Sequence, residues 1–316
     1  MRLCLIIPCF NEEDVLPIFM EQTSLVVKTI KEQYGIDTDY IFVNDGSKDG
    51  TLNILKRLHE EDPSVHYISF SRNFGKEAAL YAGLKAADGD YTAIMDADLQ
   101  DPPELLIQMC DILVNKKADC AAARRMNRKG EPPVRSWFAR RFYSLINRSE
   151  NPDLAEGVRD FRMMNNLVKN AVLSMAEYNR FSKGIFAWVG FNTEWIPYEH
   201  TDRAAGKTKW SFKALAHYGI EGLVGYTVKP LEYAAWAGIL FFLLSMIGIV
   251  FIIVRKLIFG DPVAGWPSLV CIILFCSGIQ LFCTGIIGEY LAKTYLEVKN
   301  RPVYIVQETD RVFQNL

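Results

Sequence analysis

The stretch Tyr91-Thr92-Ala93-Ile94-Met95-Asp96-Ala97-Asp98-Leu99-Gln100 joins a short apolar run to two acids and an amide. An uncharged run of this length, bounded by polar residues, predicts a buried β-strand over residues 91–95. Four other runs with the same change from apolar to polar residues predict further buried strands, at residues 3–7, 40–43, 65–70 and 120–123.

The segments between these runs have helical spacing. They cover residues 14–33, 51–61, 76–87 and 103–116, and Leu52, Leu55 and Leu58 form an apolar stripe in the second of them. Strands that alternate with helices predict an α/β fold with a Rossmann-like, mostly parallel sheet covered on both faces. Ligands of such sheets bind beyond the carboxyl ends of the strands, so the residues that follow each run are candidate site residues.

The residues that follow the fourth run carry the most specific chemistry. Asp96, Asp98 and Gln100 offer hard oxygen ligands for Mg²⁺ or Mn²⁺, ions that take substrate phosphates as further ligands. The alternative interpretation is an ordinary turn that precedes a helix at Pro103. Polar residues also follow three other predicted strands, which would bring all four groups to one edge of the sheet.

Composition and missing motifs exclude several classes of protein. The 316 residues are 50% hydrophobic, and 35 Lys and Arg against 37 Asp and Glu give a net charge of -2, which disfavours a nucleic-acid partner. The chain has no P-loop, dinucleotide fingerprint, zinc-protease or serine-esterase motif. The 7 cysteines are expected to be reduced, buried thiols of a cytosolic protein.

Two long uncharged stretches, residues 233–254 and 262–288, predict membrane-spanning helices. About 20 helical residues cross the hydrocarbon core of a bilayer, and a short connection between the two predicts a helical hairpin. Residues 1–8 are too short an apolar stretch for a signal peptide. Lys and Arg flank the hairpin mainly at its outer ends, which predicts a multi-pass protein of the inner cell membrane with its large N-terminal part and both termini in the cytoplasm. These residues are Lys207, Lys209, Lys213, Lys229, Lys293, Lys299 and Arg301, against Arg255 and Lys256 in the connection.

Five motifs stand in order ahead of these stretches: Pro8-x-x-Asn11-Glu12, Asn44-Asp45-Gly46-Ser47, Arg72-Asn73-Phe74-Gly75-Lys76, Asp96-x-Asp98-Leu99-Gln100-x-Pro102-Pro103 and Asp160-Phe161-Arg162. Together they resemble the polyprenyl-phosphate glycosyltransferases of glycosyltransferase family 2, such as the bactoprenol glucosyltransferases and the dolichyl-phosphate mannose synthases. Asn44 departs from the family, which often has a second Asp there. The resemblance implies a GT-A fold, a nucleotide-sugar donor and a lipid-phosphate acceptor.

The resemblance also implies roles for single residues. It assigns the metal to Asp98 and Gln100, the catalytic carboxylate to Asp160, and the nucleotide to Pro8, Asn11, Glu12, Asp45, Lys76 and Asp96, the last through ribose or a metal-bound water. A phosphate monoester has its second pKa near ~6, so the attacking oxygen is already largely anionic at neutral pH. Asp160 is therefore expected to orient the acceptor phosphate, or to take its residual proton, in one in-line displacement that inverts the anomeric carbon.

The acceptor side is predicted from a basic, aromatic segment at residues 124–144. Such a helix fits the headgroup region of a membrane, and Arg125, Arg141 and Ser144 are the candidate ligands of the polyprenyl phosphate. The alternative is a solvated face held by anionic lipid. Residues 203–211 resemble the family's R-x-x-G-x-S-K-[YW] loop, so Arg203, Lys207 and Lys209 are expected to close over the diphosphate, unless they are ordinary basic residues beside a membrane.

These expectations give a domain plan and a function. The plan has a GT-A domain at residues 1–210, an amphipathic interfacial segment at 211–232, two transmembrane helices within 233–292 and a cytoplasmic tail at 293–316. Gly278, Gly285 and Gly288 would permit close helix packing, and so a homo-oligomer. The predicted function is inverting, metal-dependent transfer of a hexose from UDP-glucose to undecaprenyl phosphate, giving a lipid-linked sugar for use outside the cytoplasm.

Three alternatives stay open at this point. The donor could instead be UDP-N-acetylglucosamine, GDP-mannose or a modified UDP-arabinose. A processive polysaccharide synthase is disfavoured because that class is expected to carry Q-x-x-R-W, and no Arg-Trp pair occurs in the chain. A non-catalytic membrane scaffold would have no reason to retain Asp98, Gln100 and Asp160 together.

Overall fold

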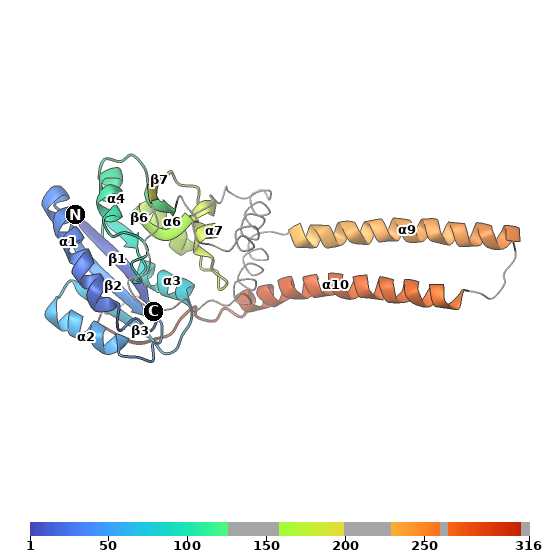
Figure 1. Ribbon diagram of the computed structural model, residues 1–316, viewed down its shortest axis with the longest axis horizontal. Helices are drawn as coiled ribbons and strands as arrows, with labels where there is room; N and C mark the ends of the chain where they lie inside the picture. The colour runs from blue at the N-terminus through green and yellow to red at the C-terminus, as the bar shows by residue number, and fades with distance from the viewer. Residues whose placement is uncertain (126–157, 199–228, 260–264, 311–316) are drawn as a thin grey trace. The chain divides into compact units, whose positions relative to one another are not determined.

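The computed structural model describes residues 1–125, 158–198, 229–259 and 265–310 (Figure 1). These belong to two units: residues 1–215 together with 301–316, and residues 216–300. The first unit contains an eight-stranded sheet in the order β7-β5-β6-β4-β1-β2-β3-β8. Its strands are β1 (Arg2–Cys9), β2 (Asp37–Asn44), β3 (Val65–Phe70), β4 (Tyr91–Ile94), β5 (Cys120–Arg125), β6 (Val158–Asn165), β7 (Thr193–Tyr198) and β8 (Val306–Thr309).

The centre of the sheet is parallel, as the sequence predicts. β1 pairs in parallel with β2 on one side and β4 on the other, and β2 pairs in parallel with β3. Three strands were not predicted from the sequence: β6, β7 and β8. β6 runs antiparallel between β4 and β5, β7 pairs in parallel with β5, and β8 closes the other edge antiparallel to β3. The predicted α/β class with a mostly parallel sheet is confirmed, although β5 is separated from β4 by β6.

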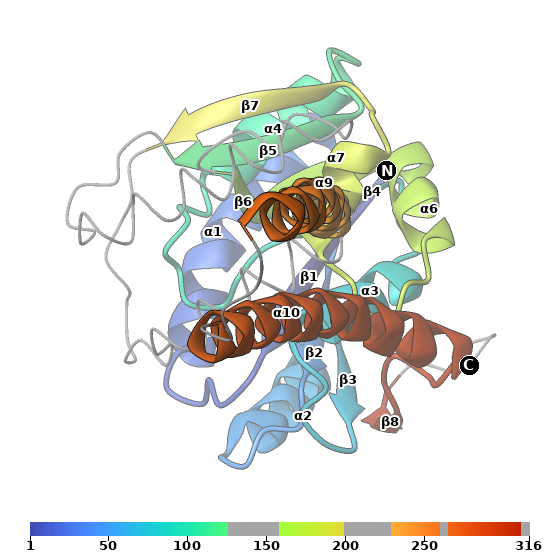
Figure 2. The ribbon, with the colours of Figure 1, turned by 90° about the vertical axis from the view of Figure 1, so that its right-hand side faces the viewer.

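Helices cover both faces of the sheet. Leu3, Leu5 and Ile7 on one face of β1 belong to the same buried apolar cluster as residues of α1, α2 and α4. On the opposite face, Gly83 of α3 lies so close to Ile6 that a Cβ at this glycine would come within 2.2 Å of the Ile6 side chain. Figure 2 shows α1 and α3 on opposite sides of β1. The helices of this unit are α1 (Leu16–Tyr34), α2 (Thr51–Glu61), α3 (Lys76–Ala86), α4 (Leu105–Val114), α6 (Asn166–Ser174) and α7 (Ser182–Trp188).

The described residues of the second unit form two long helices, α9 (Lys229–Phe259) and α10 (Trp266–Val298), which lie side by side (Figure 1). The rings of Phe241 and Phe275 meet between them with centroids 5.4 Å apart. Each helix contains a segment long and apolar enough to cross a membrane, at Pro230–Gly248 and Phe275–Val298. Large apolar side chains such as Leu281 and Phe282 are exposed along them. The prediction of two apolar C-terminal helices is confirmed.

The cysteines follow the sequence expectation only in the first unit. Cys4, Cys9, Cys110 and Cys120 are free and buried, whereas Cys276 on α10 is free but exposed. The expectation of burial is therefore wrong for Cys276, which lies on the exposed surface of an apolar helix that could cross a membrane, and Cys283 on the same helix is half-buried. Gly278, Gly285 and Gly288 have open space where a side chain would stand.

Candidate active site

The candidate site forms where the carboxyl end of β4 meets the amino end of β6. These strands are antiparallel, and Ile94 pairs with Arg162. Continuing that register by two residues brings Asp96 opposite Asp160. Lys76, the first residue of α3, reaches both: its Nζ lies 2.7 Å from Asp96 Oδ1 and 2.7 Å from Asp160 Oδ2. Residues far apart in the sequence thus converge at the sheet edge where ligands of α/β proteins bind.

The charges of this cluster control each other's ionisation. Desolvation lowers the pKa of Lys76, but the charges of Asp160 and Asp96 outweigh it and raise the pKa above its ordinary value. Desolvation also acts to raise the pKa of Asp160, but Lys76 and then Lys183 outweigh it and hold that pKa well below its usual range. Lys76 and Asp160 therefore stay ionised at neutral pH. The side chain of Lys76 is 42% exposed, so a ligand can reach the cluster from solvent.

The segment after β4 presents oxygen atoms beside this cluster. Leu99 has φ 55°, a left-handed conformation that turns the chain sharply between Asp98 and Gln100. Asp98 Oδ1 accepts a hydrogen bond of 3.2 Å from Gln100 N, and Gln100 Oε1 accepts one of 3.5 Å from Arg159 Nη2. Carboxylate and amide oxygens fit Mg²⁺ or Mn²⁺. The ammonium of Lys76 between two carboxylates shows that this edge accommodates positive charge.

A buried cluster that was not predicted from the sequence lies behind this segment. Asp101 is 5% exposed, its Oδ1 accepts a very short hydrogen bond from Tyr198 Oη, and Arg159 Nε lies 3.6 Å from it. Burial raises the pKa of Asp101, and burial together with Asp101 raises the pKa of Tyr198. Because Arg159 also contacts Gln100, the cluster ties β6 and β7 to the predicted metal-binding segment. Asp101 directly follows Gln100, which is a usable sequence signal, whereas nothing in the sequence marks Tyr198.

The loops after β1 and β2 are joined by hydrogen bonds of Asn11 and Glu12 from the first motif. Asn11 has φ 55°, donates its backbone N–H to Ser47 Oγ at 2.9 Å and accepts from Lys48 N at 2.9 Å. Glu12 donates its backbone N–H to Thr51 Oγ1 at 2.9 Å. Pro8, near the end of β1, is half-buried and pairs with Val43. Pro8, Asn11 and Glu12 therefore lie at the same sheet edge, and their contact with a nucleotide stays a prediction.

Asp45 is a buried carboxylate that holds the loop after β3. It is 4% exposed, and its two oxygens accept hydrogen bonds from Phe74 N at 2.6 Å and Gly75 N at 2.9 Å. Gly46 has φ 64°, and a Cβ there would come within 2.3 Å of the Arg72 backbone. Asp45 thus braces the loop that leads into Lys76. A carboxylate has about four acceptor positions, so a further contact with a nucleobase stays a prediction.

The predicted acceptor and lid residues lie almost entirely outside the described residues. This applies to Arg141, Ser144, Arg203, Lys207 and Lys209. Arg125 is described: it is the last residue of β5 and pairs in register with Tyr198. Their assignment to the acceptor phosphate and to the diphosphate stays a prediction.

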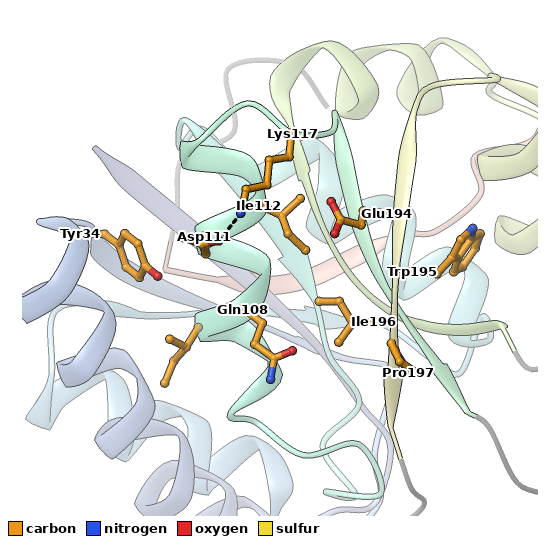
Figure 3. Close-up of a pocket in the computed structure, with 10 residues that line it drawn as sticks. Tyr34, Gln108, Asp111, Ile112, Lys117, Glu194, Trp195, Ile196 and Pro197 are labelled. Carbon is orange, nitrogen blue, oxygen red and sulfur yellow. Dashed lines mark hydrogen bonds and ion pairs between the residues drawn. The ribbon is translucent and has the colours of Figure 1, made fainter.

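Two pockets in the described part of the chain differ in their relation to this cluster. One lies among Tyr34 at the end of α1, Gln108 of α4 and Glu194 of β7, next to an ion pair of 2.7 Å between Lys117 and Asp111 (Figure 3). It contains none of the predicted site residues. The other is lined by the loop after β3, the start of α3 and the segment before α7, including Arg72, Phe74, Glu77, Tyr178 and Arg180. This second pocket adjoins Lys76.

A two-faced sheet whose carboxyl edge gathers acids, an amide and a lysine has the architecture of a GT-A glycosyltransferase. Residues 4–169 match the profile of glycosyl transferase family 2. The chain belongs to this family, and it is a glycosyltransferase.

The relatives match over nearly their whole length. The SfII prophage-derived bactoprenol glucosyl transferase of Shigella flexneri is 38% identical over 311 residues, covering 98% of this chain and 99% of the relative. The prophage bactoprenol glucosyl transferase homolog of Escherichia coli is 38% identical over 311 residues, covering 98% and 100%. Among solved structures, mannosyl-3-phosphoglycerate synthase from Rubrobacter xylanophilus matches with a TM-score of 0.50 at 15% identity over 74% of each chain, a likeness of fold alone.

Proposed function

We propose that the protein transfers glucose from UDP-glucose to a polyprenyl phosphate, undecaprenyl phosphate in the first instance. The observation that carries the proposal is the meeting of Lys76, Asp96 and Asp160 at the ligand-binding edge of the sheet. Relatives named bactoprenol glucosyl transferases, at 38% identity over 98% of the chain, support glucose and the lipid acceptor. The two long apolar helices support access to a lipid substrate.

The donor diphosphate needs its charge neutralised as it leaves. Asp98 and Gln100 are the residues that would hold a divalent cation, Mg²⁺ or Mn²⁺, with Asp96 beside them. When bound, this ion supplies Lewis-acid stabilisation of the leaving diphosphate. Arg159 and the Asp101 cluster orient Gln100 in this arrangement, and Asn11 and Glu12 hold the neighbouring loops that face the nucleotide.

Asp160 acts on the acceptor as an orienting group. Its pKa lies below its usual range because Lys76 offsets desolvation, so its carboxylate is a weaker base than a phosphate monoester with a second pKa of about 6. The acceptor phosphate oxygen forms the new bond to the anomeric carbon while the bond from that carbon to the nucleoside diphosphate breaks. Lys76 offsets the repulsion between Asp160 and the incoming phosphate. A single displacement of this kind inverts the anomeric configuration.

The membrane part of the proposal places the two apolar helices across the inner membrane. The catalytic unit and both termini lie on the cytoplasmic side, residues 211–232 lie in the interface, and the lipid phosphate is received by Arg125, Arg141 and Ser144. Arg203, Lys207 and Lys209 close over the diphosphate. Packing of a second copy against Gly278, Gly285 and Gly288 belongs to the same proposal. The placement of Lys and Arg around the helices supports the cytoplasmic orientation of the catalytic unit and the termini.

The decisive experiment offers the purified full-length protein several donors with a short-chain polyprenyl phosphate and Mg²⁺ or Mn²⁺. The donors are UDP-glucose, UDP-N-acetylglucosamine and GDP-mannose, and mass spectrometry detects the lipid-linked sugar. We expect polyprenyl-phosphate hexose from UDP-glucose only in the presence of the cation. Product from another donor would correct the sugar, and no lipid-linked product with any donor would overturn the proposal.

A further inference from the structure

A second cluster of metal-binding side chains lies near the far edge of the sheet, formed by residues of α2, β3 and the segment after β8. His59 is in the last turn of α2, His66 is in β3, and Asp310 directly follows β8. His66 Nδ1 lies 2.6 Å from Asp310 Oδ2, and His59 Nδ1 lies 3.8 Å from the same oxygen. One ligand atom from each residue lies within 4.8 Å of the others.

The cluster is held in place by its surroundings. The Asp310 side chain is 5% exposed, and its other oxygen accepts a hydrogen bond of 2.6 Å from Tyr67 N, which leaves Oδ2 facing the histidines. The His59 side chain is 35% exposed and that of His66 is 18% exposed, so an ion can enter from solvent. The two histidines thus share a carboxylate oxygen whose position is fixed by the backbone of β3.

We propose that His59, His66 and Asp310 bind a transition-metal ion, with Zn²⁺ as the ion that fits best. Zn²⁺ takes imidazole nitrogen and carboxylate oxygen at about 2.0–2.2 Å in a tetrahedron, which sets neighbouring ligand atoms about 3.3 Å apart. The observed separations of 2.6 Å and 3.8 Å lie on either side of that spacing. Water completes the fourth position. Mg²⁺ and Mn²⁺ favour oxygen donors, so this site selects a different ion from the Asp98 and Gln100 segment.

The three ligands are not equal. His59 Nδ1 also lies 2.6 Å from Val65 O, a contact that coordination through this nitrogen would replace. Among the described residues, the Nδ1 contact of His66 is with Asp310 itself, so coordination through this nitrogen replaces no contact with another residue there. Zinc affinity is therefore expected to fall more when His66 or Asp310 is replaced than when His59 is replaced.

The bound ion would fasten the end of the chain to the catalytic unit. β8 is a strand of only 4 residues with an irregular register against β3, and Asp310 lies 244 residues after His66. An ion that binds only the folded state, in which Asp310 lies beside His59 and His66, stabilises that state by mass action. Zn²⁺ thus retains β8 on the edge of the sheet.

The test is zinc titration of the full-length protein in detergent after removal of metals, without donor or acceptor. We expect one Zn²⁺ per chain by calorimetry and elemental analysis, and slower amide hydrogen exchange in residues 306–309 once zinc is added. His66→Gln and Asp310→Asn should each weaken zinc binding by more than the roughly 100-fold that loss of an outer hydrogen-bond partner costs. His59→Gln should weaken it less.

Two control variants separate this site from other effects. Glu308→Gln removes a carboxylate on β8 that pairs with Lys56 at 2.6 Å, and it should leave zinc affinity unchanged. Asp98→Ala removes the predicted catalytic metal ligand and should also leave this zinc site intact. Wild-type protein that binds no zinc, or zinc binding lost in Asp98→Ala but kept in His66→Gln, would overturn the inference. The wild-type stoichiometry and exchange data decide this even if a variant fails to fold.

Discussion

Two charged clusters lie side by side at the edge of the sheet, and they differ in exposure. In the cluster of Lys76, Asp96 and Asp160, the lysine and Asp96 side chains are 42% and 31% exposed. In the cluster of Asp101, Arg159 and Tyr198, the aspartate is 5% exposed. An exposed ion pair exchanges partners at little cost, whereas a buried one is expensive to break. Although Asp160 of the first cluster is only 18% exposed, we expect that cluster to release its contacts to substrates more readily, and the second to hold β6, β7 and the segment after β4 together.

Removing the predicted metal ligand should have the largest effect on activity. Asp98→Ala, or saturating EDTA with the wild-type protein, should stop transfer, with a loss of at least about 1000-fold, the upper range for removing one electrostatic contact to a transition state. The measurement is lipid-linked sugar formed per minute. Full activity in EDTA would contradict the metal role, and Asp111→Asn, at the remote pocket of Figure 3, is the control carboxylate.

Removing the central cation of the exposed cluster should come next. Lys76→Met should lower kcat by about 100-fold or more, because it leaves two carboxylates and the acceptor phosphate without their shared counter-charge. It should also change the pH profile. Desolvation raises the pKa of Asp160 and Lys76 is the largest influence that lowers it, so without Lys76 the carboxyl becomes protonated at a higher pH, and activity should start to fall at a higher pH than in the wild type. The same profile in both proteins would contradict this coupling.

Breaking the buried cluster should lower the free energy of unfolding clearly and kcat only slightly. Tyr198→Phe removes the hydroxyl that donates to Asp101, and loss of one partner of a buried polar group costs about 1–3 kcal/mol. Denaturant unfolding of the variant should show this loss, with a smaller fall in kcat through Gln100. Tyr34→Phe, in the pocket away from the site, is the matched control. A loss of activity without loss of stability would mean that Tyr198 touches substrate.

Among the changes to groups that act on the substrates, Asp160→Asn is expected to lower kcat least, because it keeps the shape and some hydrogen bonding of the side chain. An orienting role predicts a fall in kcat of about tenfold, below the roughly 100- to 10,000-fold typical of losing a general base, and a flat profile between about pH 6 and 8. Steady-state kinetics across that range distinguish the two roles. A far larger loss that is relieved at high pH would favour proton transfer.

The parallel half of the sheet could be predicted because its strands are continuous apolar runs. β1 to β4 are mostly buried, so each contains an uncharged apolar run that ends at polar residues, although β1 begins with Arg2 and β2 with Asp37. β6 carries Arg159, Asp160 and Arg162, and β8 is a short, polar edge strand, so neither shows that pattern. Asp160 was found from its motif, but the sequence could not show that an antiparallel strand brings it to Asp96.

Other parts of the site depend on contacts that sequence patterns do not encode. The link from Tyr198 to Asp101 spans 97 residues, and the brace of Asp45 on the loop before Lys76 uses backbone N–H groups. Neither a periodicity nor a short motif records such contacts. The end of the chain shows the same limit: a tail was predicted there, and the structure has a strand of the catalytic sheet.

The return of the chain to the sheet as β8 changes how the catalytic unit is tethered. The two apolar helices are an insertion within this unit, because residues on both sides of them belong to it. A proteolytic cut after the helices would leave residues 1–215 covalently joined to them, whereas a cut before the helices would leave residues 1–215 held to them only through the pairing of β8 with β3. Retention of the catalytic unit at the helices after a cut of the second kind therefore depends on how tightly β8 binds the sheet.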